Sequence, residues 1–318
     1  MIIYGKELFL ETQNIFNRSS IIVAFSPYIK HRTISELLKT RNSKDEFSVI
    51  TTWKPHDILN GYSDLEVYET IKEKGGRLFI NNRIHLKAFI EYGKDALVGS
   101  NNITHAGLGI SENFNHEAAV KINLDLDDNI YFDSIIEDSI LVNDQVYSSV
   151  KTQLQEYTKN NNTVDSEFEI INEQMSFLLS ALPMSKDVGS LYAIYHNQES
   201  SDKIEIQCAH ADLRRYKISK KNMSFDEFKK ILKYNFFNHP FIEKLLEYND
   251  AYESRGTVGR QFGALRQWIK ENTTTVPVPT SPDVNQPLNN VLNWIVELSD
   301  QYEKFVPGHS TILKKVIR

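Results

Sequence analysis

A short stretch in the first half of the chain carries side chains that suit the binding and cleavage of a phosphate ester. His85 and Lys87 are two residues apart, Ser100 and Asn102 lie in a Gly-Ser-Asn-Asn segment, and Glu117 follows. A neutral imidazole can attack phosphorus when its other nitrogen donates to a carboxylate, which fixes the tautomer and stabilises the imidazolium. A lysine supplies a point charge and an asparagine an amide donor for the non-bridging oxygens.

The local pattern predicts that strands position these residues. Ranges 84–90 and 96–99 have the composition of neighbouring strands joined by a turn at Gly93, and range 116–122 predicts a third strand. Side chains alternate along a strand, so His85 and Lys87 should emerge on the same face. Small and amide residues after Gly99 let the backbone turn and approach a ligand. We therefore expect the side chains of the site to come from the edges of three strands.

The acids of this stretch are too few for a two-metal phosphoryl-transfer site, which usually needs several carboxylates. Glu117 is the one obvious carboxylate, and no cysteine is nearby. The sequence therefore predicts chemistry without a metal or other cofactor.

The spacing His85-x-Lys87, eleven further residues and then Gly99-Ser100-x-Asn102, with Glu117 downstream, resembles the HxK…GSxN…E signature of the phospholipase D superfamily. The resemblance covers roughly the first half of the chain. It implies a phospholipase D-like fold and a phosphodiesterase, either a lipid-cleaving or a DNA-cleaving one. Tyr92 stands where lipid-cleaving members carry Asp, which the metal-independent restriction endonucleases of the BfiI and NgoFVII type often lack. The resemblance therefore favours a nuclease.

Composition limits the other possibilities. The 318 residues allow two domains of ordinary size or one large one, and 41% hydrophobic with 25% charged residues is typical of a globular protein. The single cysteine, Cys208, excludes an intramolecular disulfide, so a cytoplasmic location is the default. No signal pattern or membrane-length apolar run is present. The net charge of −6 means that a DNA enzyme must gather its positive charge locally.

Helical and strand patterns alternate through the first half of the chain. Helices are predicted at 6–17, at 33–38 and 63–74 behind capping-box spacings, and over 130–157. Strands are predicted at 20–25, 47–53 and 77–80. This alternation favours an α/β fold, here a mixed sheet flanked by helices, with ligands at the carboxyl ends of the parallel strands.

The polar run at 159–163 is the best linker candidate. We therefore predict a phospholipase D-like catalytic domain over 1–158 and a smaller α+β domain over 165–318 that recognises DNA. In the second domain, helices are predicted at 170–182, after Ser224, from Pro240 and over 290–305. Paired strands are predicted at 191–196 and 203–208, and a loop over 273–287.

Several basic residues are candidates for contacts with a nucleic-acid backbone. Lys54 ends a predicted strand on the expected ligand side, with Ser26 a weaker candidate at the same rim. A basic stretch in the second half could hold phosphates, and Tyr216 within it could stack on a base. The candidate cations are Arg214, Arg215, Lys217, Lys220 and Lys221, followed by Lys229, Lys230 and Lys233. A solvated basic face is the competing explanation for the stretch, and His105 and His116 are best explained as structural or surface residues.

Hydrolysis through a phosphohistidine also needs an acid that protonates the leaving oxygen. Superfamily members with two motif copies supply one histidine each, whereas this chain has one copy. The resemblance therefore implies a homodimer with two His85 side chains at one composite site. The expected function is a metal-independent DNA endonuclease in restriction or phage defence, with a methyltransferase or helicase as a candidate further partner.

Two other functions stay open from sequence alone. The protein could hydrolyse a lipid or small-molecule phosphodiester, although its composition and Tyr92 argue against lipid. It could also be a binding module of low activity within a defence complex.

Overall fold

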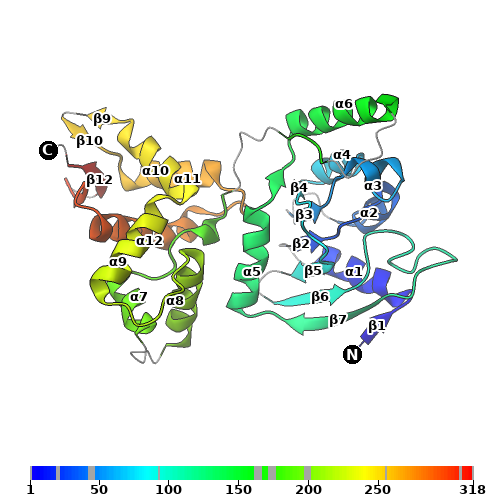
Figure 1. The fold of residues 1–318 in the computed structure, drawn as a ribbon, viewed down its shortest axis with the longest axis horizontal. Coiled ribbons are helices and arrows are strands. Elements are labelled where there is room, and N and C mark those ends of the chain that lie inside the picture. The colour runs from blue at the N-terminus through cyan, green and yellow to red at the C-terminus, as the bar shows by residue number, and fades with distance from the viewer. Residues whose placement is uncertain are drawn as a thin grey trace. The chain divides into compact units, whose positions relative to one another are not determined.

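The computed structural model describes residues 2–18, 22–41, 47–91, 94–160, 167–170, 177–196, 202–254, 256–307 and 310–316. The chain forms two compact units, Met1–Ser176 and Phe177–Arg318 (Figure 1). Most of the predicted linker, 161–163, lies outside the described residues. The preceding helix continues to Asn160, and Phe168 and Ile170 pack into the core of the first unit.

The first unit is built on a mixed sheet, which among the described residues has eight strands in the order β1-β7-β6-β5-β2-β3-β4-β8. Strands β2, β3 and β4 are parallel, and the other neighbouring pairs are antiparallel. The predicted α/β mixed sheet flanked by helices is therefore confirmed. The strands are β1 (Ile2–Tyr4), β2 (Ile22–Phe25), β3 (Phe47–Thr51), β4 (Gly76–Ile80), β5 (Ala88–Glu91), β6 (Asp95–Gly99), β7 (Ala118–Asn123) and β8 (Ile140–Leu141).

Helices cover the two faces of the sheet unequally. One face is buried in a large core with the helices α1 (Glu7–Arg18), α2 (His31–Leu37), α4 (Val67–Glu73) and α6 (Asp144–Asn160). A short helix, α3 (Pro55–Leu59), packs near α6. On the opposite face, α5 (Leu126–Glu137) covers the centre, where the rings of Phe132 and Phe25 lie 5.6 Å apart. The outer strands β7 and β1 extend beyond α5 (Figure 1).

Three predicted helices of this unit were wrong in detail. The helix expected over 130–157 is α5 and α6, separated by β8, which adds an antiparallel edge strand to β4. The expected capping boxes do not cap, because α2 begins after Lys30 and α4 after Glu66, neither with a side-chain cap. Ser63 instead accepts a hydrogen bond from the backbone of Ile29 at 3.2 Å.

The second unit is mainly helical around a core that includes Trp294, Phe236 and Phe241. Its helices are α7 (Val188–Tyr195), α8 (Lys203–Arg215), α9 (Phe225–Phe237), α10 (Pro240–Asp250), α11 (Phe262–Asn272) and α12 (Ser281–Leu298), with a 3-10 turn at Leu179–Ala181. Two small antiparallel sheets pair β9 (Glu253–Ser254) with β10 (Thr257–Val258), and β11 (Tyr302–Phe305) with β12 (Ile312–Lys315). No helix in the described parts of the chain is both long and apolar enough to cross a membrane.

Predictions for this unit had mixed outcomes. The capping box at Ser224 and the helix start at Pro240 are confirmed. The paired strands at 191–196 and 203–208 were wrong, because these segments lie within α7 and α8 behind the N-caps Asp187 and Asp202. Helix α12 begins at Ser281, inside the predicted loop, and ends before β11. Of the helix predicted at 170–182, residues 171–176 lie outside the described ones, and the described end was wrong because it holds only the 3-10 turn Leu179–Ala181.

Candidate functional site

The segments that carry the predicted site residues meet at one end of the sheet. Strands β5, β6 and β7 are antiparallel neighbours, and Gly99 at the end of β6 pairs with Ala119 of β7. The His-x-Lys segment precedes β5, the Gly-Ser-Asn-Asn segment follows β6, and the glutamate precedes β7. Phe25 pairs with Ala88, so this is also the carboxyl end of the parallel strands. The residues at this end are His85, Lys87, Ser100, Asn102 and Glu117.

The strand predicted over 84–90 is shorter than expected, because β5 begins at Ala88. The hydrogen-bond ladder nevertheless reaches the site, since the backbone N–H of Gly99 donates to the carbonyl of Lys87 at 3.2 Å. On the other side of β6, the N–H of Ser100 donates to the carbonyl of Ala118 at 3.1 Å. Backbone pairing therefore fixes the separation of the three segments.

Gly99 allows these segments to approach closely. A Cβ atom at this position would lie 2.4 Å from the carbonyl oxygen of Ala118 and 2.6 Å from the Cβ of Ala119. We predict that Gly99→Ala forces β6 and β7 apart and lowers the free energy of unfolding by roughly 1–3 kcal/mol. Urea unfolding of the first unit, followed through Trp53, measures this. Ser100→Ala, which adds no atom between the strands, should cost less; an equal or larger loss in Ser100→Ala would contradict the packing argument.

Glu117 is held by two side chains. The Ser100 hydroxyl donates to Oε2 of Glu117, and Asn115 Nδ2 donates to Oε1 at 3.2 Å. The Ser100 oxygen also accepts the backbone N–H of Ala118 at 3.2 Å. Both carboxylate oxygens are therefore oriented, and among the described residues neither bonds to His85. Asn115 was not predicted from the sequence, although its position two residues before Glu117 on an extended segment places both side chains on one side.

Lys87 is the buried charge of the site. Only 8% of the residue is exposed, and its ammonium group donates to the backbone carbonyl of His85 at 2.8 Å. Burial lowers the pKa of Lys87, while the nearby Glu117 carboxylate acts in the opposite direction. A cation with so little water around it is available to stabilise an anionic ligand more strongly than an exposed lysine would.

Asn102 is oriented by a loop that is distant in sequence. Its Oδ1 accepts the backbone N–H of Tyr28 at 3.4 Å, and the next residue, Ile103, bridges to Ile29. Ser26 holds the same junction, because its hydroxyl accepts the N–H of Ile103 at 2.9 Å and donates to the carbonyl of Tyr28. In the described part of the chain, the Asn102 amide nitrogen has no protein acceptor and can donate to a ligand. Ser26 is fully buried, so its proposed place on the rim was wrong.

His85 is exposed, and among the described residues its ring has no hydrogen-bond partner. The other two histidines of the region differ in their surroundings. His105 Nε2 lies 3.1 Å from Glu36 of α2 and therefore has a structural contact. His116 is exposed beside Glu117. Tyr92, which separated the nuclease from the lipid interpretation, lies outside the described residues.

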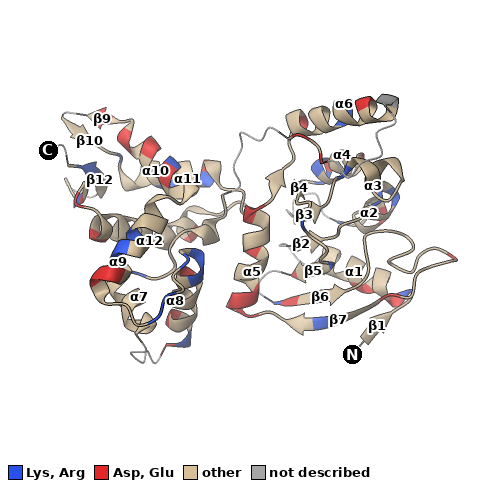
Figure 2. Cartoon of the chain, in the orientation of Figure 1, with Lys and Arg blue, Asp and Glu red and all other residues tan. Residues whose placement is uncertain are grey.

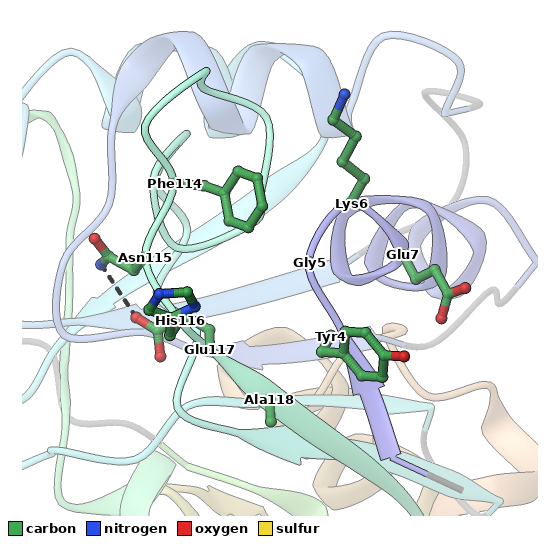
Figure 3. A pocket seen from close by; sticks show the side chains of 9 residues that line it. All are labelled: Tyr4, Gly5, Lys6, Glu7, Phe114, Asn115, His116, Glu117 and Ala118. Carbon is green, nitrogen blue, oxygen red and sulfur yellow. Dashed lines mark hydrogen bonds between the residues drawn. The ribbon is translucent and has the colours of Figure 1, made fainter.

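A surface hollow of about 680 Å³ borders the site. Figure 3 shows His116 and Glu117 on one wall, with Asn115 directed at the Glu117 carboxylate, and Tyr4 and Phe114 nearby. Glu117 belongs both to the hollow and to the site at the sheet end. The Glu117 carboxylate is therefore open to the surface on the side of the hollow.

The predicted backbone-binding residues fall into separate places. Lys54 follows β3 at the same sheet end as the site, as the N-cap of α3. The basic stretch belongs to the second unit, where Arg214 and Arg215 end α8 and Lys220 lies 3.6 Å from Glu227. Tyr216 cannot stack on a base: it is 1% exposed, and its hydroxyl donates to the carbonyl of Ala181 at 3.2 Å.

Comparison with known proteins gives partial structural likenesses. No protein-family model and no curated protein matches the chain. The chain is similar to Nuc, a phospholipase D family member from Salmonella typhimurium, with 17% identity over 42% of this chain and 89% of that one, at a TM-score of 0.34. It is similar to NucT from Helicobacter pylori, with 14% identity over 44% and 96%, at 0.33.

A third likeness is to the phosphatidylserine synthase of Haemophilus influenzae Rd KW20, with 15% identity over 54% of this chain and 46% of that one, at a TM-score of 0.37. At these identities and TM-scores, the likenesses assign neither an activity nor a substrate to this chain.

Proposed function

We propose that the protein is a phosphodiesterase that cleaves DNA as a homodimer, with His85 as the nucleophile. The observation that carries the proposal is that a buried lysine, an asparagine with a free amide donor, an oriented carboxylate and an exposed histidine all lie in segments that flank one end of neighbouring strands. Such a set binds a tetrahedral anion and offers it a nitrogen nucleophile.

The reaction has two steps. In the first, an imidazole nitrogen of His85 attacks phosphorus, a P–N bond forms, and the P–O bond to the leaving strand breaks. In the second, water attacks phosphorus, the P–N bond breaks, and the imidazole is regenerated. Lys87 and Asn102 stabilise the non-bridging oxygens in both steps, while Glu117 orients an imidazole and stabilises its charged form.

The proton transfers require a second group besides the nucleophile. The leaving oxygen needs a proton in the first step, and the attacking water must lose one in the second. The sequence has one His-x-Lys copy, so within this proposal the second imidazole is His85 of another chain. A two-fold axis through the site places one imidazole on each side of phosphorus.

An uncovered apolar face supports the homodimer. Ile2 pairs with Val120 and Tyr4 with Ala118, so these side chains share one face of the sheet. Ile2, Tyr4, Val120 and Ile122 are 61%, 65%, 40% and 39% exposed. The intervening Lys121 points to the other face, where it pairs with Glu11 of α1.

This alternation is the reverse of that expected for an isolated sheet, in which the polar side chains face water. The face is uncharged at Ile2, Tyr4, Val120 and Ile122, so it can meet a copy of itself without repulsion. It also reaches the site, because β7 begins at Ala118, directly after Glu117. A second chain docked there would bring its own sheet end close to the first.

Charge on this face should separate the two chains. We predict that Val120→Asp raises the dimer dissociation constant at least about a hundredfold, since a buried unpaired carboxylate costs several kcal/mol. Sedimentation velocity measures the change, and DNA cleavage should fall with the dimer fraction. Lys121→Asp, on the opposite face of the same strand, is the matched control and should leave the dimer intact. A wild-type chain that stays monomeric while cleaving DNA would refute the dimeric site.

The experiment that tests the function is incubation of supercoiled plasmid with the purified protein in EDTA. Cleavage by the wild type that disappears in His85→Ala supports the proposal. Hydrolysis of a phosphatidyl substrate without any DNA cleavage would show that the substrate is a lipid and not DNA. Inactivity on both substrates, together with tight binding to another protein, would indicate a binding module.

A further inference from the structure

A groove of about 940 Å³ lies on the second unit, between α9, the turn after α12 and the end of β12. Lys230, Lys233, Tyr234 and Phe237 of α9 line one wall. Their spacing of three or four residues places them on one face of the helix. Figure 2 shows acidic residues at the start of α9 and basic residues further along it.

The groove gathers positive charge in a chain whose net charge is −6. Lys230 and Lys233 are exposed, and neither has an ion-pair partner among the described residues. Lys315 also lines the groove but is neutralised by Asp250, with 2.6 Å between Nζ and Oδ2. Among the described residues, Asp300 is the one acid that lines the groove. The two uncompensated lysines leave a net positive wall, which favours an anionic ligand.

An aromatic ring stands between these cations. Tyr234 is 71% exposed, although it lines a concave surface, while Phe237 one turn further along is half-buried. Lysines that hold a backbone, next to an exposed ring on which a base can stack, are the combination used to bind single-stranded nucleic acid. A paired base would not offer its face to the ring, so the arrangement fits an unpaired nucleotide.

We propose that this groove binds a single-stranded segment of DNA, with its phosphates on Lys230 and Lys233 and a base stacked on Tyr234. The inference rests on the proposed nuclease function and locates substrate binding in the second unit. It places the stacking contact on Tyr234 of α9 and not on Tyr216, the buried residue that was predicted to stack from its position in the basic stretch.

The test is the binding of a fluorescein-labelled single-stranded oligonucleotide to the full-length chain carrying His85→Ala, which keeps the probe intact. Tyr234→Ala should weaken binding about tenfold, and Tyr234→Phe should restore it, because stacking needs only the ring. Lys230→Ala with Lys233→Ala should reduce the slope of log affinity against log salt by roughly 1.4. All these side chains are exposed, so thermal melting should show unchanged folding.

Lys244→Ala is the matched control, because Lys244 lies on the neighbouring helix α10 and is paired with Glu247 at 2.8 Å. It should change neither the affinity nor the salt slope. Unchanged binding in both the Tyr234→Ala and the double-lysine variants would overturn the groove assignment, and so would an equal loss in Lys244→Ala. Plasmid cleavage by the wild-type protein is measured separately. Cleavage together with unchanged oligonucleotide binding in the groove variants refutes only this inference, whereas absence of cleavage refutes the proposed function.

Discussion

Replacement of His85 by alanine is expected to lower the rate of DNA cleavage at least about 10⁴-fold. The variant loses the nucleophile from one chain and the proton donor from the other, so both halves of the reaction fail together. The side chain is exposed, so the free energy of unfolding should change by no more than about 0.5 kcal/mol. Initial rates of plasmid nicking and urea unfolding measure the two effects.

Two controls make this result specific. His210→Ala removes an exposed histidine of α8 in the second unit and should leave the rate unchanged. After equimolar co-refolding of wild-type and His85→Ala chains, about a quarter of the dimers should contain His85 in both chains. Activity per wild-type chain should therefore halve. Full activity per wild-type chain would mean that each chain works alone.

Lys87→Met is expected to lower the cleavage rate by about 10²–10³-fold without lowering stability. Lys87 is nearly buried and its pKa is lowered by burial, so the folded protein disfavours the charged form that an anionic substrate needs. Methionine fills the same space without that cost. Thermal melting should therefore give an equal or higher midpoint for the inactive variant; a clear loss of stability would mean that Lys87 is structural.

The pH dependence follows from the direction of the same pKa shift. Because the folded pKa of Lys87 lies below its ordinary value of 10.5, the unfolded chain binds more protons between the two values, and stability rises with pH across that window. Lys87→Met should lose this rise. Lys94→Met is the control, since Lys94 is exposed in the turn between β5 and β6 and pairs with Glu91. Its pH dependence of stability should retain the rise.

Much of the site could be predicted because its residues directly flank the ends of three consecutive strands. The run from His85 to Glu117 contains β5 and β6 and ends directly before β7, so spacing in sequence translates directly into proximity at one sheet end. Long-range partners could not be predicted in this way. Tyr28 reaches Asn102 across 74 residues through a backbone N–H, which carries no sequence signal.

The errors in the fold have a common physical origin. Ser63 accepts a hydrogen bond from the backbone of Ile29, and Asp64 pairs with Lys30, so neither residue caps α4. Tertiary contacts therefore replaced the local capping motif. The alternating Lys203–Cys208 segment resembles a strand, yet in α8 it precedes Ala209 and Asp212, which are buried against the helical core. Periodicity over six residues cannot separate these outcomes.

The apolar face of β1 and β7 could not be predicted from the sequence either, because it depends on β1 pairing with a strand more than a hundred residues later. Val120 and Ile122 alternate with Lys121 as in any half-buried strand. Only the register identifies the apolar side as the uncovered one, and this connects the site to the proposed dimer.

The most direct test of the account is the stoichiometry of the covalent intermediate. Rapid acid-free quenching of the wild-type protein with a labelled DNA substrate, followed by peptide mass spectrometry, should find a phosphoramidate on His85 in no more than one of every two chains. An adduct on every chain would contradict the shared site. An adduct on another residue, or turnover in which repeated quenching traps none, would contradict the phosphohistidine mechanism.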